Sequence, residues 1–259
     1  MLHSGLVSIS FRSLDPAAII DLARQGRLRG IEWGGDVHVP HGDLERAHGV
    51  RRMTEDAGLL VASYGSYYRA ADPSPENPDF EEVLASAKAL HAPVVRVWCG
   101  RKGSKEADAS YRGEVIEDLD RISRRAAADG VAVACEFHGG TLTDTNESAL
   151  DLYDSVASGN LFPYWQPPVG RSQGYRLDGL RALLPTLCNL HVFYWREVDG
   201  KRERCALAEG EDVWLPFLEL AAGTGRDHWA MLEFVRNDSA EQLLEDAATL
   251  NRWLEQVQA

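Results

Sequence analysis

The sequence predicts an α/β fold, a closed (β/α)8 TIM barrel that forms one domain over residues 1–259. Short runs of β-branched and apolar residues alternate eight times with longer amphipathic patterns. The length of 259 residues suits a barrel of this kind, whose usual size is about 250 residues. An open doubly wound sheet is the alternative, but its Gly-x-Gly-x-x-Gly turn is missing after the first predicted strand, where the chain reads FRSLDPAA.

The first half of the chain carries clear signals for where helices begin and end. Asp15 is a suitable N-cap for a helix whose first residue is Pro16, and Gly58 ends the second helix. The predicted elements, strand and helix in turn, are Leu6–Phe11, Pro16–Gln25, Gly30–Trp33, Leu44–Ala57, Leu59–Tyr64, Phe80–Leu90, Val94–Trp98 and Arg112–Asp129.

The second half continues the same alternation. Gly130 ends the long fourth helix, and Ser239 is a suitable N-cap for the last one. The predicted elements are Val131–Phe137, Glu147–Ala157, Leu161–Trp165, Leu177–Leu184, Leu187–Trp195, Val213–Ala222, Trp229–Phe234 and Ala240–Val257. The stretch Arg196–Asp212 is too polar for a core, and both a lid and a plain solvated loop remain open.

Composition and charge exclude several classes of function. A net charge of −13 argues against a nucleic-acid partner, because phosphate backbones are bound by clustered Lys and Arg. No run of 18 apolar residues indicates a transmembrane helix, and the N-terminus lacks the pattern of a signal peptide, so no membrane partner is expected. The four cysteines have no C-x-x-C spacing, which favours free thiols and a cytoplasmic location.

Charged residues stand at the ends of three predicted strands that are otherwise apolar. Glu136 closes the fifth strand, His191 lies in the seventh, and Glu233 closes the eighth. A charge in that position is costly unless it binds something, and active sites of barrels lie at the carboxyl ends of the strands. Two carboxylates and an imidazole suit Mn²⁺, Mg²⁺, Co²⁺ or Zn²⁺. The alternative is that Glu136 and Glu233 form structural ion pairs with Arg96 or Arg236.

The motifs EFH, LHV and LEF, in this order on the fifth, seventh and eighth strands, resemble the xylose isomerase-like superfamily of TIM barrels. The resemblance extends to GIEWGGDVH on the second strand and covers nearly the whole chain. It is to the sugar-phosphate isomerase/epimerase branch, which also holds ketose 3-epimerases, hydroxypyruvate isomerases, inosose dehydratases and AP endonucleases of the endonuclease IV type.

The resemblance implies a divalent metal held by residues of the fifth to eighth strands. By position these are Glu136, Gln166, His191 and Glu233. Gln166, in YWQPP, departs from the family, which usually has Asp there and a His shortly after it. A carboxamide oxygen can still bind a metal but adds no charge, so we expect weak binding.

Other polar and aromatic residues near the predicted strand ends are candidates for substrate binding. His38 resembles a family position that touches substrate, although a loop histidine bonded to Asp36 is an equal alternative. Arg96 either binds a substrate oxygen or neutralises Glu136. The aromatic residues suit the C–H faces of a sugar or polyol. The full set of candidate substrate-binding residues is His38, Arg96, Trp98, His138, Trp165 and Arg236.

The predicted site favours proton transfer next to a carbonyl. A metal acidifies the C–H between a ketone and a hydroxyl, and Glu136 and Glu233 are placed to move the proton. We therefore predict a metal-dependent isomerase or epimerase of a sugar, sugar phosphate or keto-polyol that acts through an enediolate. A keto-polyol dehydratase (a lyase resembling inosose dehydratase) and a non-catalytic sugar-binding barrel are the alternatives. An AP endonuclease is disfavoured by the charge and by only eight histidines. The oligomeric state stays open, a homo-oligomer included.

Overall fold

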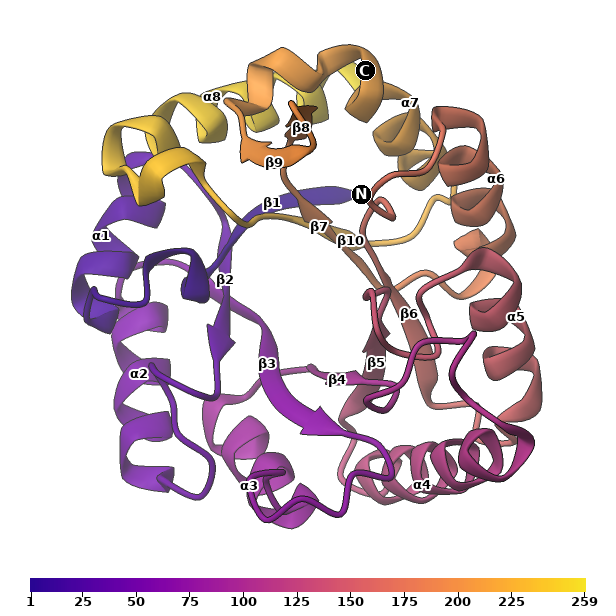
Figure 1. Ribbon diagram of the computed structural model, residues 1–259. Coiled ribbons are helices and arrows are strands. Elements are labelled where there is room, and N and C mark those ends of the chain that lie inside the picture. The colour runs from indigo at the N-terminus through magenta and orange to yellow at the C-terminus, as the bar shows by residue number, and fades with distance from the viewer.

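The computed structural model describes residues 1–259 and shows a closed barrel of parallel strands inside a ring of helices (Figure 1). The barrel closes in the order β1-β10-β7-β6-β5-β4-β3-β2. Its strands are β1 (Leu2–Val7), β2 (Gly30–Gly34), β3 (Leu60–Arg69), β4 (Val94–Trp98), β5 (Ala132–Glu136), β6 (Leu161–Trp165), β7 (Asn189–Val192) and β10 (His228–Leu232). The predicted (β/α)8 fold is confirmed.

Each barrel strand is followed by a helix on the outside of the barrel (Figure 1). The helices are α1 (Pro16–Gln25), α2 (Leu44–Asp56), α3 (Phe80–Leu90), α4 (Ala109–Ala127), α5 (Asn146–Ser155), α6 (Gln173–Leu183), α7 (Glu211–Ala222) and α8 (Ala240–Val257). The predicted caps are present, since Asp15 accepts from the Ala18 N–H at 2.9 Å and Ser239 from the Gln242 N–H at 3.2 Å. None of the helices combines the length and the apolar character that crossing a bilayer requires.

The first strand was predicted in the wrong place. Leu6–Phe11 reads as an apolar run, but β1 ends at Val7 and residues Ser8–Phe11 form the 3₁₀ turn η1. The true strand includes Gly5, where a Cβ atom would lie 2.8 Å from Cγ of Met231 on the neighbouring β10. This close approach of two strands cannot be read from the local sequence.

The polar stretch after β7 contains structure of its own. β7 ends at Val192 rather than Trp195, and the chain then forms an antiparallel hairpin of β8 (Trp195–Val198) and β9 (Lys201–Arg204). This β8–β9 hairpin stands on the barrel at the carboxyl end of β7 and is followed by the 3₁₀ turn η3 (Leu207–Gly210) (Figure 1). It therefore has the position of a lid, whereas a structureless loop is excluded.

The core divides into a large shell between strands and helices and a small cluster inside the barrel. The inner cluster is Val7, Ala62, Val94, Ala134, Tyr164 and Met231. These side chains fill the barrel, as is usual for eight strands, so it is not a pore. The polar residues of the site lie next to this cluster, towards the carboxyl ends of the strands.

Candidate metal centre

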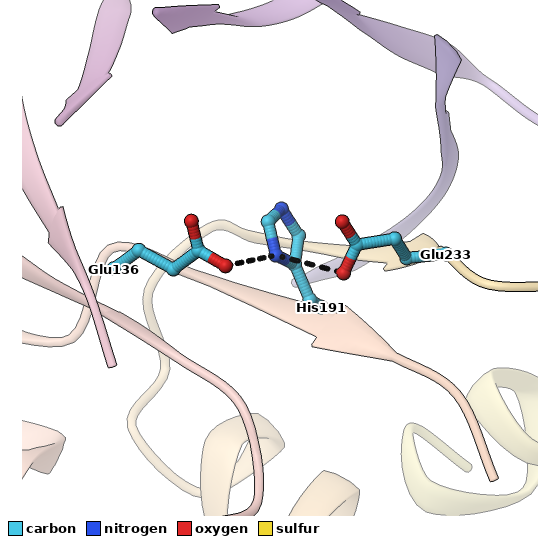
Figure 2. Close-up of side chains that lie close together, drawn as sticks. All are labelled: Glu136, His191 and Glu233. Carbon is cyan, nitrogen blue, oxygen red and sulfur yellow. Dashed lines mark ion pairs between the residues drawn. The ribbon is translucent and has the colours of Figure 1, made fainter. Parts of the chain in front are cut away.

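Glu136, His191 and Glu233 converge at the carboxyl ends of β5, β7 and β10. Figure 2 shows the imidazole between the two carboxylates. Nδ1 of His191 lies 3.7 Å from Oε1 of Glu136 and 3.4 Å from Oε2 of Glu233. One ligand atom from each residue lies within 4.8 Å of the others. Ligand atoms at about 2.1 Å from one ion are separated by about 3–4 Å, so these spacings suit a shared divalent cation.

Several polar atoms of this cluster are buried without a hydrogen-bond partner. They are both ring nitrogens of His191, Oε2 of Glu233 and Oε1 of Gln166. His191 is fully buried, and Glu136 and Glu233 are each 4% exposed. Buried polar atoms rarely stay unpaired in folded proteins, because each costs the free energy of its lost hydration. Two carboxylates, one imidazole and one carboxamide oxygen are a donor set that fits Mg²⁺, Mn²⁺, Co²⁺ or Zn²⁺.

The carboxylate of Glu136 is held by three donors. Arg96 Nη1 and Trp98 Nε1 both donate to Oε2 at 2.5 Å, and Gln166 Nε2 donates to Oε1 at 3.0 Å. Burial alone would raise the pKa of Glu136, but the charges of Arg96 and His191 hold that pKa well below its usual range. Glu136 is therefore a fixed anion. Its ion pair with Arg96 is the structural pairing that the sequence left open, and it coexists with a place in the candidate metal centre.

Gln166 reaches the centre from the end of β6. Its Nε2 donates to the carbonyl oxygen of Phe137 at 2.9 Å as well as to Glu136. The carbonyl can only accept, so it sets the amide orientation and leaves Oε1 as the free atom. Oε1 is buried and unpaired, as expected for a neutral oxygen ligand in place of the usual aspartate.

Glu32, on β2, is the central residue that the sequence pattern failed to single out. It is fully buried and accepts hydrogen bonds from Ser63 Oγ at 2.6 Å and Tyr164 OH at 2.5 Å on Oε2. Its Oε1 accepts from Arg96 Nε at 3.1 Å and lies 3.4 Å from Nε2 of His191. Glu32 thus faces the side of the imidazole opposite to Glu136 and Glu233. A charge inside the apolar run GIEWG was the available signal.

The ionisation of the cluster follows from burial and mutual charge. Burial alone would lower the pKa of His191, but the carboxylates of Glu233 and Glu32 raise it to about 10. Burial raises the pKa of Glu233 to about 7, against the opposing effect of His191. Burial would also raise the pKa of Glu32, but His191 and Arg96 lower it to about 2. In the metal-free protein the imidazole therefore carries a proton that a metal would displace.

Three of the six candidate substrate-binding residues do not reach the centre. His38 is buried, with Nδ1 2.9 Å from Ser8 Oγ and Nε2 3.2 Å from the Leu14 carbonyl oxygen, so neither substrate nor Asp36 is its partner. Trp165 faces the helix layer and packs on Phe217 of α7 at 4.9 Å between ring centroids. Arg236 lies on the 3₁₀ turn η4 (Arg236–Asp238), donates to Gln242 and pairs with Glu209 at 3.5 Å.

The other three candidates border the centre. Arg96 is buried between Glu32 and Glu136, which limits it to a role beneath the substrate. Trp98 is partly exposed, and its ring lies 5.3 Å from that of His138. His138 follows β5, and its Nδ1 lies 2.7 Å from the Gly139 carbonyl oxygen.

A pocket of about 390 Å³ opens beside the centre. Gln166 and His138 line it, and the β8–β9 hairpin contributes Trp195 and Arg202 to the lining. Phe193 and Phe234 complete an aromatic wall with Trp195. This volume holds a small hydroxylated molecule, and Gln166 is the candidate metal ligand that lines it.

Comparison with known proteins places the chain among barrels of one kind. A sequence model of the family described as xylose isomerase-like TIM barrel matches residues 20–256. A 3-dehydroshikimate dehydratase of Bacillus anthracis is 26% identical over 166 residues, which are 61% of this chain and 59% of that protein. The matched region thus spans about three fifths of the length of this curated relative.

Solved structures share the fold over nearly the whole chain. The probable 3-DHS dehydratase involved in petrobactin synthesis from Bacillus anthracis has a TM-score of 0.78 at 22% identity, over 97% of this chain and 99% of that chain. A xylose isomerase-like TIM barrel protein from Mycobacterium smegmatis in complex with magnesium has a TM-score of 0.78 at 15% identity, over 99% and 98%. D-psicose 3-epimerase with D-tagatose from Clostridium cellulolyticum H10 has a TM-score of 0.74 at 14% identity, over 99% of both chains.

Proposed function

This chain belongs to the xylose isomerase-like TIM barrel family, and we propose that it is a metal-dependent enzyme that removes a proton next to the carbonyl of a small hydroxylated ketone. Residues 1–259 act as a single domain, and Glu136, Gln166, His191 and Glu233 hold the ion. The observation that carries the proposal is that buried metal-ligand atoms converge beside a pocket and that several of them have no hydrogen-bond partner. A protein with magnesium among the structural relatives supports the ion.

The bound ion would polarise the carbonyl and stabilise the negative charge that develops on its oxygen. The chain's own residues divide the remaining work unequally. Glu136 stays ionised because Arg96, Trp98 and Gln166 all donate to it, so it orients and holds but is a poor carrier of protons. Glu233 Oε2 accepts no hydrogen bond, so its carboxylate is freer than that of Glu136 to accept and return a proton.

This asymmetry favours dehydration over epimerisation, one of the two reactions that the sequence placed first. Glu233 takes the proton from the carbon next to the carbonyl, the carbon–carbon double bond forms, and the neighbouring hydroxyl leaves as water with that proton. One mobile carboxylate is enough for such an elimination, whereas inversion at carbon needs a proton donor on each face. The dehydratase relative at 26% identity supports this choice.

An epimerase is the second candidate, and a specific observation favours it. Glu136 and Glu233 flank Nδ1 of His191 from opposite directions, as two groups on the two faces of one carbon would (Figure 2). Epimerases are among the structural relatives. For this reaction the hydrogen bonds to Glu136 would have to weaken when substrate binds.

The test uses purified protein loaded with Mg²⁺ or Mn²⁺ and a panel of cyclic and open-chain hydroxyketones in deuterated water. A dehydratase yields an unsaturated ketone that absorbs in the ultraviolet, whereas an epimerase yields a stereoisomer with deuterium at one carbon. Elemental analysis and metal titration accompany the assay. Protein that binds no divalent ion, or that exchanges no proton in any substrate, would refute the proposal.

A further inference from the structure

We propose that Arg202 and Trp195 of the β8–β9 hairpin form a subsite for an anionic group, a carboxylate or a phosphate, carried by the ligand of the neighbouring pocket. The inference rests on the proposed function only in taking that ligand to be the substrate. It assigns the substrate to the acidic or phosphorylated hydroxyketones rather than to neutral sugars.

Among the three arginines of the hairpin, Arg202 alone has no partner. Arg196 pairs with Glu209 at 2.6 Å, and Arg204 pairs with Asp238 at 2.5 Å. Both pairs tie the base of the hairpin to the barrel. Arg202 forms no ion pair or side-chain hydrogen bond, yet it lines the pocket beside Gln166 and His138. A guanidinium with free donors matches the two oxygens of a carboxylate or phosphate.

Trp195 also lines this pocket and carries an unpaired donor. Its indole Nε1 is buried and has no hydrogen-bond acceptor. The ring packs against both Phe193 and Phe234, with centroids 4.9 Å away in each case. Because a buried, unpaired N–H is costly, an acceptor on the ligand would stabilise this arrangement.

The charge of the floor is compatible with an anion above it. Glu32, Glu136 and Glu233 face Arg96, and a divalent ion would balance the remaining negative charge. Gln166 keeps this balance, whereas a fourth carboxylate would leave the floor negative. Asp144 is the acidic residue of the lining, and its Oδ2 accepts from the Ser104 N–H at 3.1 Å rather than from Arg202. Glu197 lies opposite Arg202 in the hairpin register, but no ion pair joins the two side chains, so the guanidinium keeps its donors free beside the pocket.

The experiment measures binding of two matched pairs of probes by calorimetry. The pairs are shikimate with its neutral methyl ester and D-fructose 6-phosphate with D-fructose. Each is titrated into wild type, Arg202→Gln, Arg202→Lys, Lys201→Gln and Asp144→Asn, with Mg²⁺ and again with EDTA. Lys201, at the exposed tip of the hairpin outside the pocket lining, controls for a general loss of positive charge.

In wild type we expect the charged member of one pair to bind about tenfold or more tightly than its neutral partner. Arg202→Gln removes this preference, Arg202→Lys keeps part of it, and Lys201→Gln keeps it. The pair that shows the preference identifies the carboxylate or the phosphate as the anion.

Equal affinities within both pairs, or no binding of either charged probe at about millimolar concentration, would overturn the subsite. An equal loss of the preference in Asp144→Asn would also overturn it, because the preference would then depend on a contact between Arg202 and Asp144 rather than on the ligand. A preference that persists in EDTA supports the subsite even where metal-dependent catalysis fails, so the two proposals fail separately.

Discussion

The two ends of this barrel are both hollowed, but they differ in how their polar atoms are satisfied. Beside the N-terminal end of β1 lies the larger hollow, about 570 Å³, lined by residues such as Arg29 and Asn251. None of its lining side chains has a buried polar atom without a partner. The smaller pocket at the carboxyl end, about 390 Å³, includes Gln166 and Trp195, which both have one. The pocket beside the candidate metal centre is thus the one whose lining contains unpaired buried polar atoms, although it is the smaller of the two.

The strongest test of this contrast neutralises single carboxylates, two at the carboxyl end and one at the other end. Glu233→Gln and Glu136→Gln should each abolish proton exchange at the substrate carbon, by about a thousandfold or more, because the first carries the proton and the second holds the ion. Glu255→Gln, in the hollow at the other end, should leave the rate within about twofold. Deuterium incorporation measured by NMR decides, with circular dichroism as the check on folding. Exchange that persists in Glu233→Gln would remove Glu233 from the acid/base role.

A second substitution tests the buried support beneath the metal ligands. Glu32→Gln takes away the negative charge that faces Nε2 of His191 at 3.4 Å and Nε of Arg96 at 3.1 Å. Groups that orient a ligating imidazole are worth about 10–100-fold in metal affinity, so binding should weaken by that amount. Metal titration gives the affinity, and ¹⁵N chemical shifts of His191 report its tautomer. Unchanged shifts with unchanged affinity would mean that Glu32 acts only in packing.

Metal affinity should fall as pH falls, because His191 and Glu233 are protonated in the metal-free protein. In the metal-free protein the pKa of His191 is about 10, so the imidazole is protonated below that pH. The pKa of Glu233 is about 7, so its carboxyl group is protonated below pH 7. Both protons must leave when the ion binds, so affinity falls as pH falls, by about tenfold per unit near pH 8 and more steeply below 7. Calorimetry in buffers of different ionisation enthalpy should show about one proton released near pH 8 and nearly two near pH 6. Affinity independent of pH over this range would contradict the arrangement.

Gln166→Asp tests the departure from the family pattern. The added carboxylate should tighten metal binding by about tenfold. The longer Gln166→Glu should gain less, because its second oxygen would face the Phe137 carbonyl where Nε2 now donates at 2.9 Å. Metal titration of both variants provides the comparison. If neither differs from wild type, the side chain of residue 166 is not at the metal.

The smallest effect is expected for a substitution in the larger hollow, beside the N-terminal end of β1. Asn251 Nδ2 donates to the Gly26 carbonyl oxygen at 3.1 Å, far from the pocket. Asn251→Ala should cost about 1 kcal/mol in the free energy of unfolding while activity stays within about twofold. Chemical denaturation and a rate assay measure the two quantities. A large loss of activity would mean that the N-terminal hollow has a function of its own.

The sequence by itself determined the barrel and the heart of the site. Hydrophobic period, caps and breakers are local properties, so α1, α3, α8, β4 and β6 were predicted with their observed bounds. In a parallel barrel all carboxyl ends lie at one end, so Glu136, His191 and Glu233 had to come close once the eightfold alternation was recognised. Strand parity puts Gln166 on the inward face and Trp165 towards the helices. The prediction that Trp165 binds substrate disregarded that parity.

Tertiary structure decided which polar residues share partners across the chain. Glu32 meets Tyr164 across 132 residues of sequence, and no local pattern encodes that contact. His38 hydrogen-bonds to Ser8, which lies just after the end of β1. Arg236 is followed by Asn237 and Asp238, whose left-handed backbone changes the direction of the chain. The hairpin that brings Arg202 to the pocket arises within a stretch whose polarity alone indicates only solvent. Such pairings depend on how the strands stagger around the barrel, which is set by packing of distant side chains and not by the run in which each residue stands.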